Sequence, residues 1–323
     1  MRMFDKSHYL QLTLPLMYRT ANLQDCLFQD NWSGSKGGCV ACFNHGQLIM
    51  SRVTLKSNQA QLGGVFHITD FCTVTLVDCT ITNNTASSQA GAFFMSSSGV
   101  AHLVHTEVSF NRALDGEGGG ATISDSSEMT SVDSLFLNNT GLYGGAIYLV
   151  TSVGFSPVNT TFSSNSAVFS GGAVMIRKTA ESTWQNCTCN GNIAGRNGGC
   201  FSGEPTVVHF THCKMEGNRA MNGGALAFKS TTNATGSYNR FTSNNASKEG
   251  GAIFIGALAC YKETNSTIFQ NHAEKQGGGM AFQGSIVSLE GLSFYQNTAT
   301  VGGALVFSSN GRLTPQVYNC TLR

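Results

Sequence analysis

Residues 134–149, SLFLNNTGLYGGAIYL, contain the two short motifs that decide the fold. The first is the Phe-x-x-Asn tetrapeptide from Phe136 to Asn139, and the second is Gly144-Gly145-Ala146. The same pair recurs along the chain, with Phe162, Phe241 or Phe294 in the aromatic position of the other clear copies. Looser copies place Leu, Ile, Val, Cys or Met there. Self-similarity of this kind predicts a repeat architecture.

The asparagine of the first motif sets the period of the repeat. Successive copies are 26 to 28 residues apart along the whole chain. We expect these residues to form one structural ladder: Asn31, Asn58, Asn84, Asn111, Asn139, Asn165, Asn192, Asn218, Asn244, Asn271 and Asn297. Asparagine tolerates a left-handed backbone, and its amide can bond the same groups one repeat above and below.

Apolar residues within each repeat alternate with a period of two. Ile147 and Leu149 fall on one face, as do Val174 and Ile176. Short alternating runs bounded by glycine and asparagine predict β-strands, and no window favours a helix of ten residues. We therefore predict an all-β protein: a single-stranded, right-handed parallel β-helix of about 11 rungs of 26–28 residues and about three strands each, without substantial helix.

Two further features fit a coil of stacked rungs. Paired glycines supply the backbone angles of a tight corner. A second column lies two residues before the aromatic position and holds small residues, which we interpret as structural packing rather than disulfides or metal ligands. Its members are Cys26, Cys79, Cys187, Cys213 and Cys320, with Ser134, Thr160 and Ser266 between them.

The repeats also predict the domain organisation. We expect residues 1–22 to be an irregular N-terminal segment and residues 23–323 to be the β-helix, truncated in a twelfth rung that begins at Tyr318. An open sheet edge invites pairing, so further rungs or a cap beyond Arg323 are expected.

Composition narrows the function. The chain has 38 glycines, 4 prolines and 41% hydrophobic residues, which excludes collagen and disfavours disorder. A net charge of +1 predicts no nucleic-acid partner. No apolar run is long enough for a transmembrane helix, and no convincing signal peptide is encoded within the chain.

The motifs for metals or cofactors are weak. Asp115 and Glu117, with Asp125 and Glu128 nearby, are an oxygen-rich calcium candidate, but they lack the alternating spacing of a dedicated loop, and we interpret them as a solvated insertion. Cys39 and Cys42 have no second cysteine pair at zinc spacing. The pairs His102 with His105 and His209 with His212 are oddly spaced on strands. We expect no cofactor and no catalytic residues.

Asn-x-Ser/Thr sequons occur nine times, a modest excess over what composition produces. They permit, without establishing, a glycosylated surface protein. The sequon asparagines are Asn31, Asn83, Asn138, Asn159, Asn186, Asn233, Asn245, Asn265 and Asn319.

On these motifs the chain resembles the polymorphic outer membrane proteins of chlamydiae, which carry repeated Gly-Gly-Ala-Ile and Phe-x-x-Asn tetrapeptides. Gly144–Ile147 and Gly250–Ile253 match the first motif, and the rungs starting at Phe28 and Phe136 are among those that match the second. The resemblance covers residues 23–322, and similar repeats occur in large surface proteins of protists and algae. It implies a surface-exposed adhesin on a pectin-lyase-like superfold.

We therefore expect a non-catalytic protein at the cell surface or outside the cell, in the outer membrane if bacterial, that serves adhesion or scaffolding. Its expected partner is a host or neighbouring-cell surface protein or glycan. The alternative is a polysaccharide-acting enzyme or carbohydrate-binding protein. An enzyme would need carboxylates and a cation lining a groove on adjacent rungs.

Overall fold

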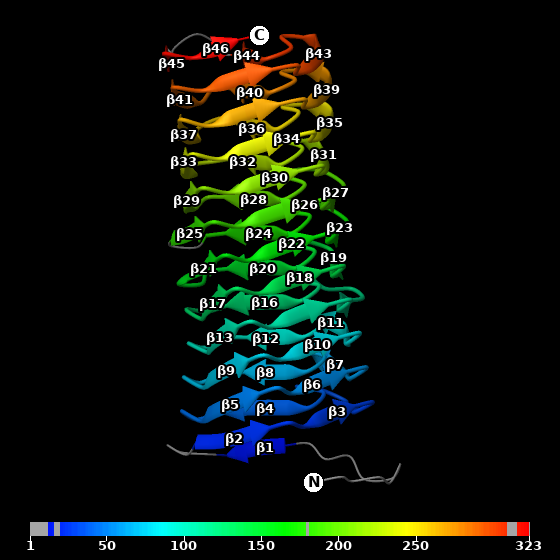
Figure 1. The fold of residues 1–323 in the computed structure, drawn as a ribbon. Coiled ribbons are helices and arrows are strands. Elements are labelled where there is room, and N and C mark those ends of the chain that lie inside the picture. The colour runs from blue at the N-terminus through cyan, green and yellow to red at the C-terminus, as the bar shows by residue number, and fades with distance from the viewer. Residues whose placement is uncertain (1–11, 16–19, 179–180, 309–314, 323) are drawn as a thin grey trace.

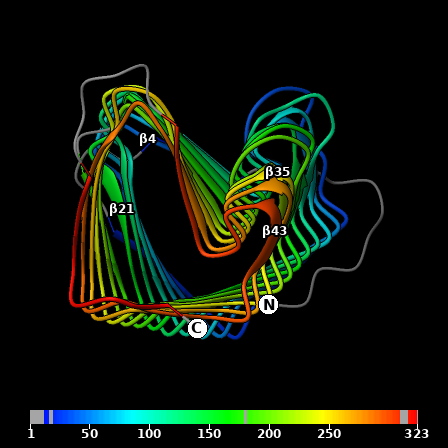
Figure 2. The same ribbon diagram turned by 90° about the horizontal axis from the view of Figure 1, so that it is seen from above.

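The computed structural model describes residues 12–15, 20–178, 181–308 and 315–322. Within these residues the chain is all-β, with no helix, and winds into a β-solenoid of about 11 turns (Figure 1). Four parallel sheets run the length of the rod. In Figure 2 each turn runs anticlockwise toward the viewer, from the sheet of β35 (Asn245–Glu249) to that of β4 (Val40–Phe43) and then that of β21 (Gly154–Val158), so the coil is right-handed. The predicted fold class is confirmed.

Sheet A contains the strands that follow the glycine pairs. Their alternate side chains, such as Ile147 and Leu149, point into the core. The strands are β1 (Leu12–Pro15), β4 (Val40–Phe43), β8 (Phe66–Ile68), β12 (Phe93–Met95), β16 (Ala121–Ser124), β20 (Ile147–Val150), β24 (Val174–Arg177), β28 (Phe201–Glu204), β32 (Leu226–Phe228), β36 (Ile253–Ile255), β40 (Met280–Gln283) and β44 (Leu305–Ser308).

Sheet B comes next along each turn and shows the clearest alternation of buried and exposed residues. Its strands are β2 (Thr20–Gln24), β5 (Gln47–Ser51), β9 (Thr73–Val77), β13 (Val100–Val104), β17 (Glu128–Val132), β21 (Gly154–Val158), β25 (Glu181–Gln185), β29 (Val207–Thr211), β33 (Asn233–Ser237), β37 (Cys260–Thr264), β41 (Ile286–Glu290) and β45 (Gln316–Tyr318).

Sheet C carries the aromatic column at the centre of each strand, where Phe136 stacks on Phe162 with ring centroids 5.1 Å apart. Its strands are β3 (Leu27–Gln29), β6 (Thr54–Lys56), β10 (Thr80–Thr82), β14 (Glu107–Ser109), β18 (Leu135–Leu137), β22 (Thr161–Ser163), β26 (Thr188–Asn190), β30 (Lys214–Glu216), β34 (Arg240–Thr242), β38 (Thr267–Phe269), β42 (Ser293–Tyr295) and β46 (Thr321–Leu322). Sheets A, B and C together enclose the core (Figure 2).

Sheet D is a fourth strand per turn, where we expected three. It lies between the ladder asparagine and the glycine pair and projects from the core as an arm (Figure 2). Its strands are β7 (Gln59–Leu62), β11 (Thr85–Gln89), β15 (Arg112–Ala113), β19 (Thr140–Gly141), β23 (Ser166–Ala167), β27 (Ile193–Ala194), β31 (Arg219–Asn222), β35 (Asn245–Glu249), β39 (His272–Gln276) and β43 (Thr298–Val301).

A column of small residues explains why this strand escaped the sequence pattern. The residue two positions after each ladder asparagine from Asn58 onward is alanine, except for Gly141. A Cβ added to Gly141 would lie 2.0 Å from the carbonyl oxygen of Glu117, so the arm is too thin for large apolar side chains. Without large side chains the alternation of a strand is hard to recognise.

The ends of the solenoid differ from the predicted boundary at residue 23. Strand β1 pairs with β4, and β2 pairs with β5, so residues 12–15 and 20–22 already belong to strands. Strands β45 and β46 pair with β41 and β42 and form part of a twelfth turn.

The asparagine ladder is a continuous hydrogen-bond chain from Asn31 to Asn297. At Asn139 the backbone N–H and Nδ2 both donate to Asn165 Oδ1, at 3.0 Å each. Asn139 Nδ2 also donates to the Val108 carbonyl, at 2.8 Å, and Asn139 Oδ1 accepts from Asn111. Every step between successive ladder asparagines repeats this pattern.

The ladder asparagines do not have the left-handed backbone that we expected of them. The residue immediately before each one does, for example Asn138 at φ 52° before Asn139. The amide hydrogen bonds, rather than tolerance of a left-handed backbone, are therefore the physical reason for asparagine at this position.

The glycine pair serves two purposes at the corner between the arm and sheet A. The first glycine, such as Gly250 at φ 66°, has a left-handed backbone. The second glycine allows a close approach, since a Cβ on Gly251 would lie 2.0 Å from the Gly278 carbonyl oxygen.

The cysteines of the predicted column are free thiols. Cys79 Sγ, for example, donates to the carbonyls of Val77 and Met50. The structure contains two disulfides elsewhere. Cys42–Cys72 links successive rungs, and Cys189–Cys200 joins sheet C to the corner before β28. Because Cys42 is disulfide-bonded and Cys39 is a buried free thiol, the Cys-x-x-Cys motif does not act as one unit.

One carboxyl group lies fully inside the core. Glu263 accepts hydrogen bonds from Asn239 Nδ2 at 2.9 Å, from Ser266 Oγ and from the Tyr261 hydroxyl. The neighbouring position in the column is Gly236, whose lack of a side chain leaves the space that Glu263 occupies. Burial raises the pKa of Glu263 to about 7, although these three donors oppose the shift.

We predict that Asn165→Ala lowers the free energy of unfolding by about 3 kcal/mol or more, because it leaves buried groups of Asn139 and Phe136 without partners. The control is Asn190→Ala, at an exposed position in β26, which should change stability by less than about 0.5 kcal/mol. Urea titration measures both. Equal losses in the two variants would contradict the role assigned to the ladder.

We predict that Glu263 makes the fold less stable as pH rises. Because its pKa is raised above the ordinary 4.5 to about 7, the folded state holds an extra proton between these values. The stability relative to Glu263→Gln should therefore be greatest below pH 4.5 and fall by about 3 kcal/mol as pH rises through 7. Urea midpoints of both proteins measured from pH 4 to 8 test this, and parallel profiles would refute it.

Candidate functional site

The outer face of sheet A is buried although it lies outside the core. Its outward side chains are at most 8% exposed over most of the sheet, because the arm lies opposite them (Figure 2). The residues concerned are Ala41, His67, Thr122, Tyr148, Met175, Ser202, Ala227, Phe254 and Ala281. The arm therefore covers this face, and we call the line along which the arm and sheet A meet the groove.

Aromatic and cationic side chains meet in the middle of the groove. Tyr143, at the end of the arm in its rung, lies 6.1 Å from Tyr148 of sheet A and 4.9 Å from Phe169, between ring centroids. The Arg196 guanidinium carbon lies 4.8 Å from the Phe169 ring centroid, a cation–π contact. Burial raises the pKa of Tyr148.

A cavity of about 550 Å³ opens in the C-terminal third of the groove, and we call it the pocket. The arm and sheet A contribute its walls, and the turns from sheet A to sheet B contribute its rim. It is lined by Asn222, Lys229, Ser230, Thr231, Lys248, Glu249, Phe254, Gly256, Ala257, Leu258 and Gln283.

The pocket combines one bridged carboxylate with two lysines. Gln283 Nε2 donates to Glu249 Oε2 at 2.6 Å, which joins sheet A to the arm across the groove. Among the described residues, neither Lys229 nor Lys248 has a carboxylate partner. Phe254 packs with Ala227 and Ala281 as a small apolar cluster beneath these polar groups.

A buried hydroxyl lies on the same outer face, one rung before Ala227. Ser202 Oγ is fully buried and has no hydrogen-bond partner in the described part of the chain. The outer face of sheet A therefore contains polar side chains as well as apolar ones. At least one of them, Ser202, makes no hydrogen bond to a described residue through its hydroxyl group.

Sequence reasoning missed all of these residues. The available signal was the pair Lys248-Glu249 directly before Gly250, because residues preceding a glycine pair end the arm and face sheet A. The expectation of a three-strand rung concealed this, since it provided no arm for such residues to occupy.

His67 lies in the N-terminal part of the groove. Its ring stacks on Phe94 with centroids 5.4 Å apart. Burial lowers the pKa of His67 to about 4, and the nearby charge of Lys36 contributes. The His67 ring is only 4% exposed, which accounts for this shift.

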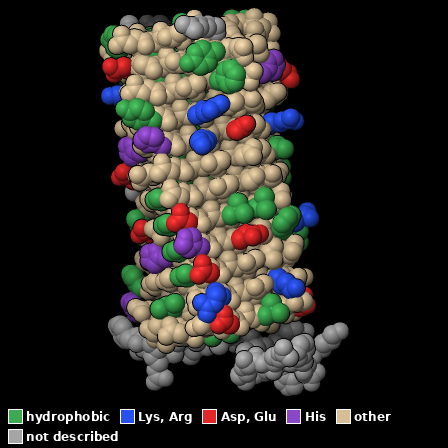
Figure 3. Space-filling model, in the orientation of Figure 1, with side chains coloured by type: hydrophobic (Ala, Val, Ile, Leu, Met, Phe, Trp, Pro, Cys, Tyr) green, Lys and Arg blue, Asp and Glu red, His purple; other side chains and the backbone are tan. Residues whose placement is uncertain are grey.

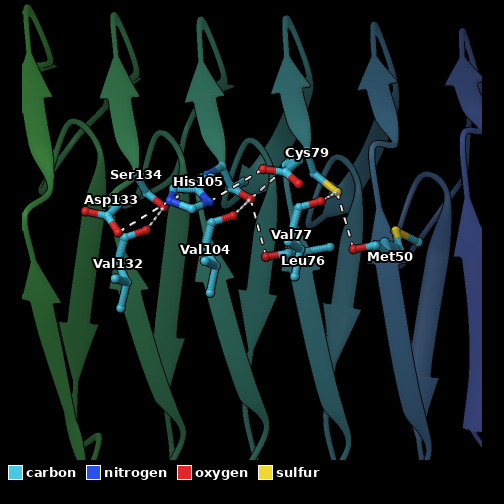
Figure 4. Close-up of polar contacts among 11 residues, drawn as sticks. Met50, Leu76, Val77, Cys79, Val104, His105, Val132, Asp133 and Ser134 are labelled. Atoms are coloured by element: carbon cyan, nitrogen blue, oxygen red, sulfur yellow. Dashed lines mark hydrogen bonds and ion pairs between the residues drawn. The ribbon is translucent and has the colours of Figure 1, made fainter.

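The other predicted histidines pair across rungs rather than with their neighbours in sequence. At the corner between sheets B and C, His105 lies 3.6 Å from Asp78 of one adjacent rung and 3.4 Å from Asp133 of the other. Figure 4 shows the contact with Asp133. His102 Nδ1 instead contacts Thr130 Oγ1, at 2.8 Å, and His209 and His212 likewise have separate partners.

The residues of the calcium candidate lie at two different corners. Asp115 and Glu117 belong to the turn from the arm to sheet A, whereas Asp125 and Glu128 flank the turn from sheet A to sheet B. In the described part of the chain, no group of three or more His, Cys, Asp or Glu side chains is arranged to hold a metal ion.

Most sequon asparagines lie on the surface at corners. Asn31 is the exception, because it belongs to the ladder and donates to Asn58. Six of the others have a left-handed backbone, which asparagine adopts readily, so the fold itself accounts for much of the excess. These are Asn83, Asn138, Asn159, Asn186, Asn265 and Asn319.

The surface shown in Figure 3 has no broad patch of one charge. Lysine, arginine, aspartate and glutamate side chains are scattered among uncharged residues on that face. No helix in the described part of the chain is long and apolar enough to cross a membrane.

The fold is a parallel β-solenoid with an arm on one side and a pocket where the arm meets sheet A. The chain is similar to "Metabotropic glutamate receptor-like protein R" of Dictyostelium discoideum, with 30% identity over 163 residues, or 50% of this chain and 10% of that protein. It is also similar to "Probable outer membrane protein pmp20" of Chlamydia pneumoniae, with 27% identity over 238 residues, or 69% of this chain and 13% of that protein. The aligned region is thus a small part of each relative. No family model matches the chain. No solved structure matches it.

We predict that His67 stays neutral in the folded protein down to about pH 4 and so destabilises the fold in acid. The unfolded state, with a pKa near 6.5, binds the proton first. Relative to His67→Phe, the native chain should lose about 2 to 3 kcal/mol between pH 6.5 and 4. NMR titration of the imidazole and urea unfolding of both proteins measure this. An imidazole that titrates near pH 6.5 in the folded state would contradict it.

Proposed function

We propose that this chain is a non-catalytic β-helix repeat protein, secreted or displayed at a cell surface, that binds its partner along the groove. Its similarity to a protein named as a probable outer membrane protein supports a surface location. The repeated Phe-x-x-Asn and Gly-Gly-Ala motifs support membership of the polymorphic outer membrane protein repeat family. Two disulfides fit an oxidising compartment.

The groove is the observation that carries this proposal. Sheet A and the arm meet on every full rung, so exposed side chains along the groove recur at intervals set by the strand spacing of about 4.8 Å. Solenoids commonly bind large partners through extended surfaces of this repeating kind. Adhesion or scaffolding would then rest on many weak contacts, with a surface protein or a glycan of a host or neighbouring cell as partner.

A polysaccharide-acting enzyme is the second candidate, because Lys229 and Glu249 lie on adjacent rungs of the pocket. Acid–base cleavage of a glycosidic bond generally uses two carboxyl groups. Glu249 is the single carboxylate among the lining residues, and its Oε2 is bridged to Gln283. This arrangement supports binding rather than cleavage.

We predict that substitutions in the groove weaken the attachment of this protein to cells. Thr231→Trp at the pocket rim, and Arg196→Ala in the middle of the groove, should each weaken binding of protein-coated beads to cultured cells at least about tenfold, through steric exclusion and loss of the cation–π contact. Flow cytometry measures bead attachment.

Matched changes on other faces provide the controls. Thr183→Trp on sheet B and Arg240→Ala on sheet C alter exposed residues away from the groove and should leave attachment unchanged. Equal effects of the groove and control variants would refute the proposal. Release of unsaturated or reducing sugars from polysaccharides by the wild-type protein would favour the enzyme instead.

A further inference from the structure

The pocket differs from the rest of the groove in its charge. Lys229 and Lys248 contribute two positive charges, and Glu249 contributes one negative charge. Because neither lysine is paired with a carboxylate among the described residues, the pocket has an uncompensated positive charge. Ammonium groups lining a concave site favour an anionic ligand, since charge-assisted hydrogen bonds are the strong ones.

The position of Lys229 is supported by a neighbouring glycine. A Cβ added to Gly256 would lie 3.2 Å from Lys229 Cγ and 3.5 Å from the Phe254 ring. The lysine stem therefore lies across Gly256, over the apolar cluster of Phe254. This packing holds the ammonium group at the edge of the pocket and reduces the entropy lost on binding.

The hydrogen bond from Gln283 to Glu249 limits the shape of the ligand. It joins the arm to sheet A directly across the groove at the pocket. A polymer that runs through the groove would have to break this bond. The pocket therefore suits the end of a chain, which enters from the open rim formed by Ser230, Thr231 and Leu258.

The uncharged polar groups of the pocket indicate which kind of chain end it can bind. Asn222, Gln283, Ser230 and Thr231 offer both donors and acceptors, and Glu249 is an acceptor that would repel a uniformly anionic ligand. A sugar acid has hydroxyl groups that donate to a carboxylate and its own carboxylate that accepts from lysines. An acidic peptide can donate to Glu249 only through its backbone N–H groups, and its many carboxylates face the Glu249 charge, so the lining favours a sugar.

We propose that the pocket binds the terminal acidic sugar of a glycan, with Lys229 and Lys248 on the sugar carboxylate and Glu249 on its hydroxyl groups. The volume of about 550 Å³ lies within the ordinary range of small-ligand pockets, and one or two sugar residues suit it. The acidic-sugar site rests on the proposed function and specifies the class of partner for one part of the groove.

The test is calorimetric titration of the intact chain with defined probes. Methyl N-acetylneuraminide and methyl glucuronide are the acidic probes, methyl galactoside is the neutral probe, and hexaglutamate is the acidic peptide. At least one acidic sugar should bind, and more weakly as salt increases. Lys229→Gln and Lys248→Gln should each weaken that binding at least about tenfold, because each removes a charge-assisted hydrogen bond.

The matched controls are Lys214→Gln on sheet C and Lys262→Gln on sheet B, both exposed lysines away from the groove, which should leave affinity unchanged. Gly256→Ala provides a second test without loss of charge, because it displaces Lys229 and should weaken binding several-fold. Circular dichroism confirms that each variant is folded.

Three results would overturn this inference: no acidic sugar binds, the lysine variants bind it as well as the controls do, or hexaglutamate binds more tightly than either sugar. Each is distinguishable from failure of the proposed function. If Arg196→Ala and Thr231→Trp abolish cell attachment while Lys229→Gln and Lys248→Gln do not, the groove remains the binding face and only the acidic-sugar pocket is refuted.

Discussion

The buried asparagine ladder is the interaction on which the rest of the structure depends. From Asn58 to Asn271 each amide bonds to the rung above and the rung below, so the polar groups at this corner are satisfied without water. An amide that must reach identical partners on both sides imposes one corner conformation on every rung, while the repeat length varies from 26 to 28 residues. The four sheets, the aromatic column and the glycine corners all follow from this fixed register.

Because the rungs stack in a strict register, equivalent core residues form columns along the rod. A residue that differs from the rest of its column is accommodated by its immediate neighbours. Glu263 occupies a place that holds apolar residues in many other rungs, and it fits because the adjacent Gly236 has no side chain. Tyr261 and Ser266 come from the same rung and satisfy the carboxylate. The solenoid therefore accepts a buried titratable group where two neighbouring rungs compensate for each other.

The arm has the opposite role, because it creates a surface that a compact three-sided coil would not have. By standing against the outer face of sheet A, it buries residues such as Phe254 and brings Lys248 and Glu249 opposite Lys229 and Gln283. The similarities to a receptor-like protein and a probable outer membrane protein each cover a small part of those longer proteins. The site proposals accordingly rest on this local geometry.

The repeat length, the parallel β-helix and the inward columns can be predicted from the amino-acid sequence, because the period of 26 to 28 residues and the alternation of two are properties of the sequence. It did not reveal the arm, whose strands contain small residues such as Ala86 and Ala167 instead of large apolar ones. It also misplaced the left-handed backbone by one residue, as at Asn138. Only the tertiary structure decided the groove and its pocket, because Lys229 and Gln283 are 54 residues apart in the sequence and meet only when successive rungs stack.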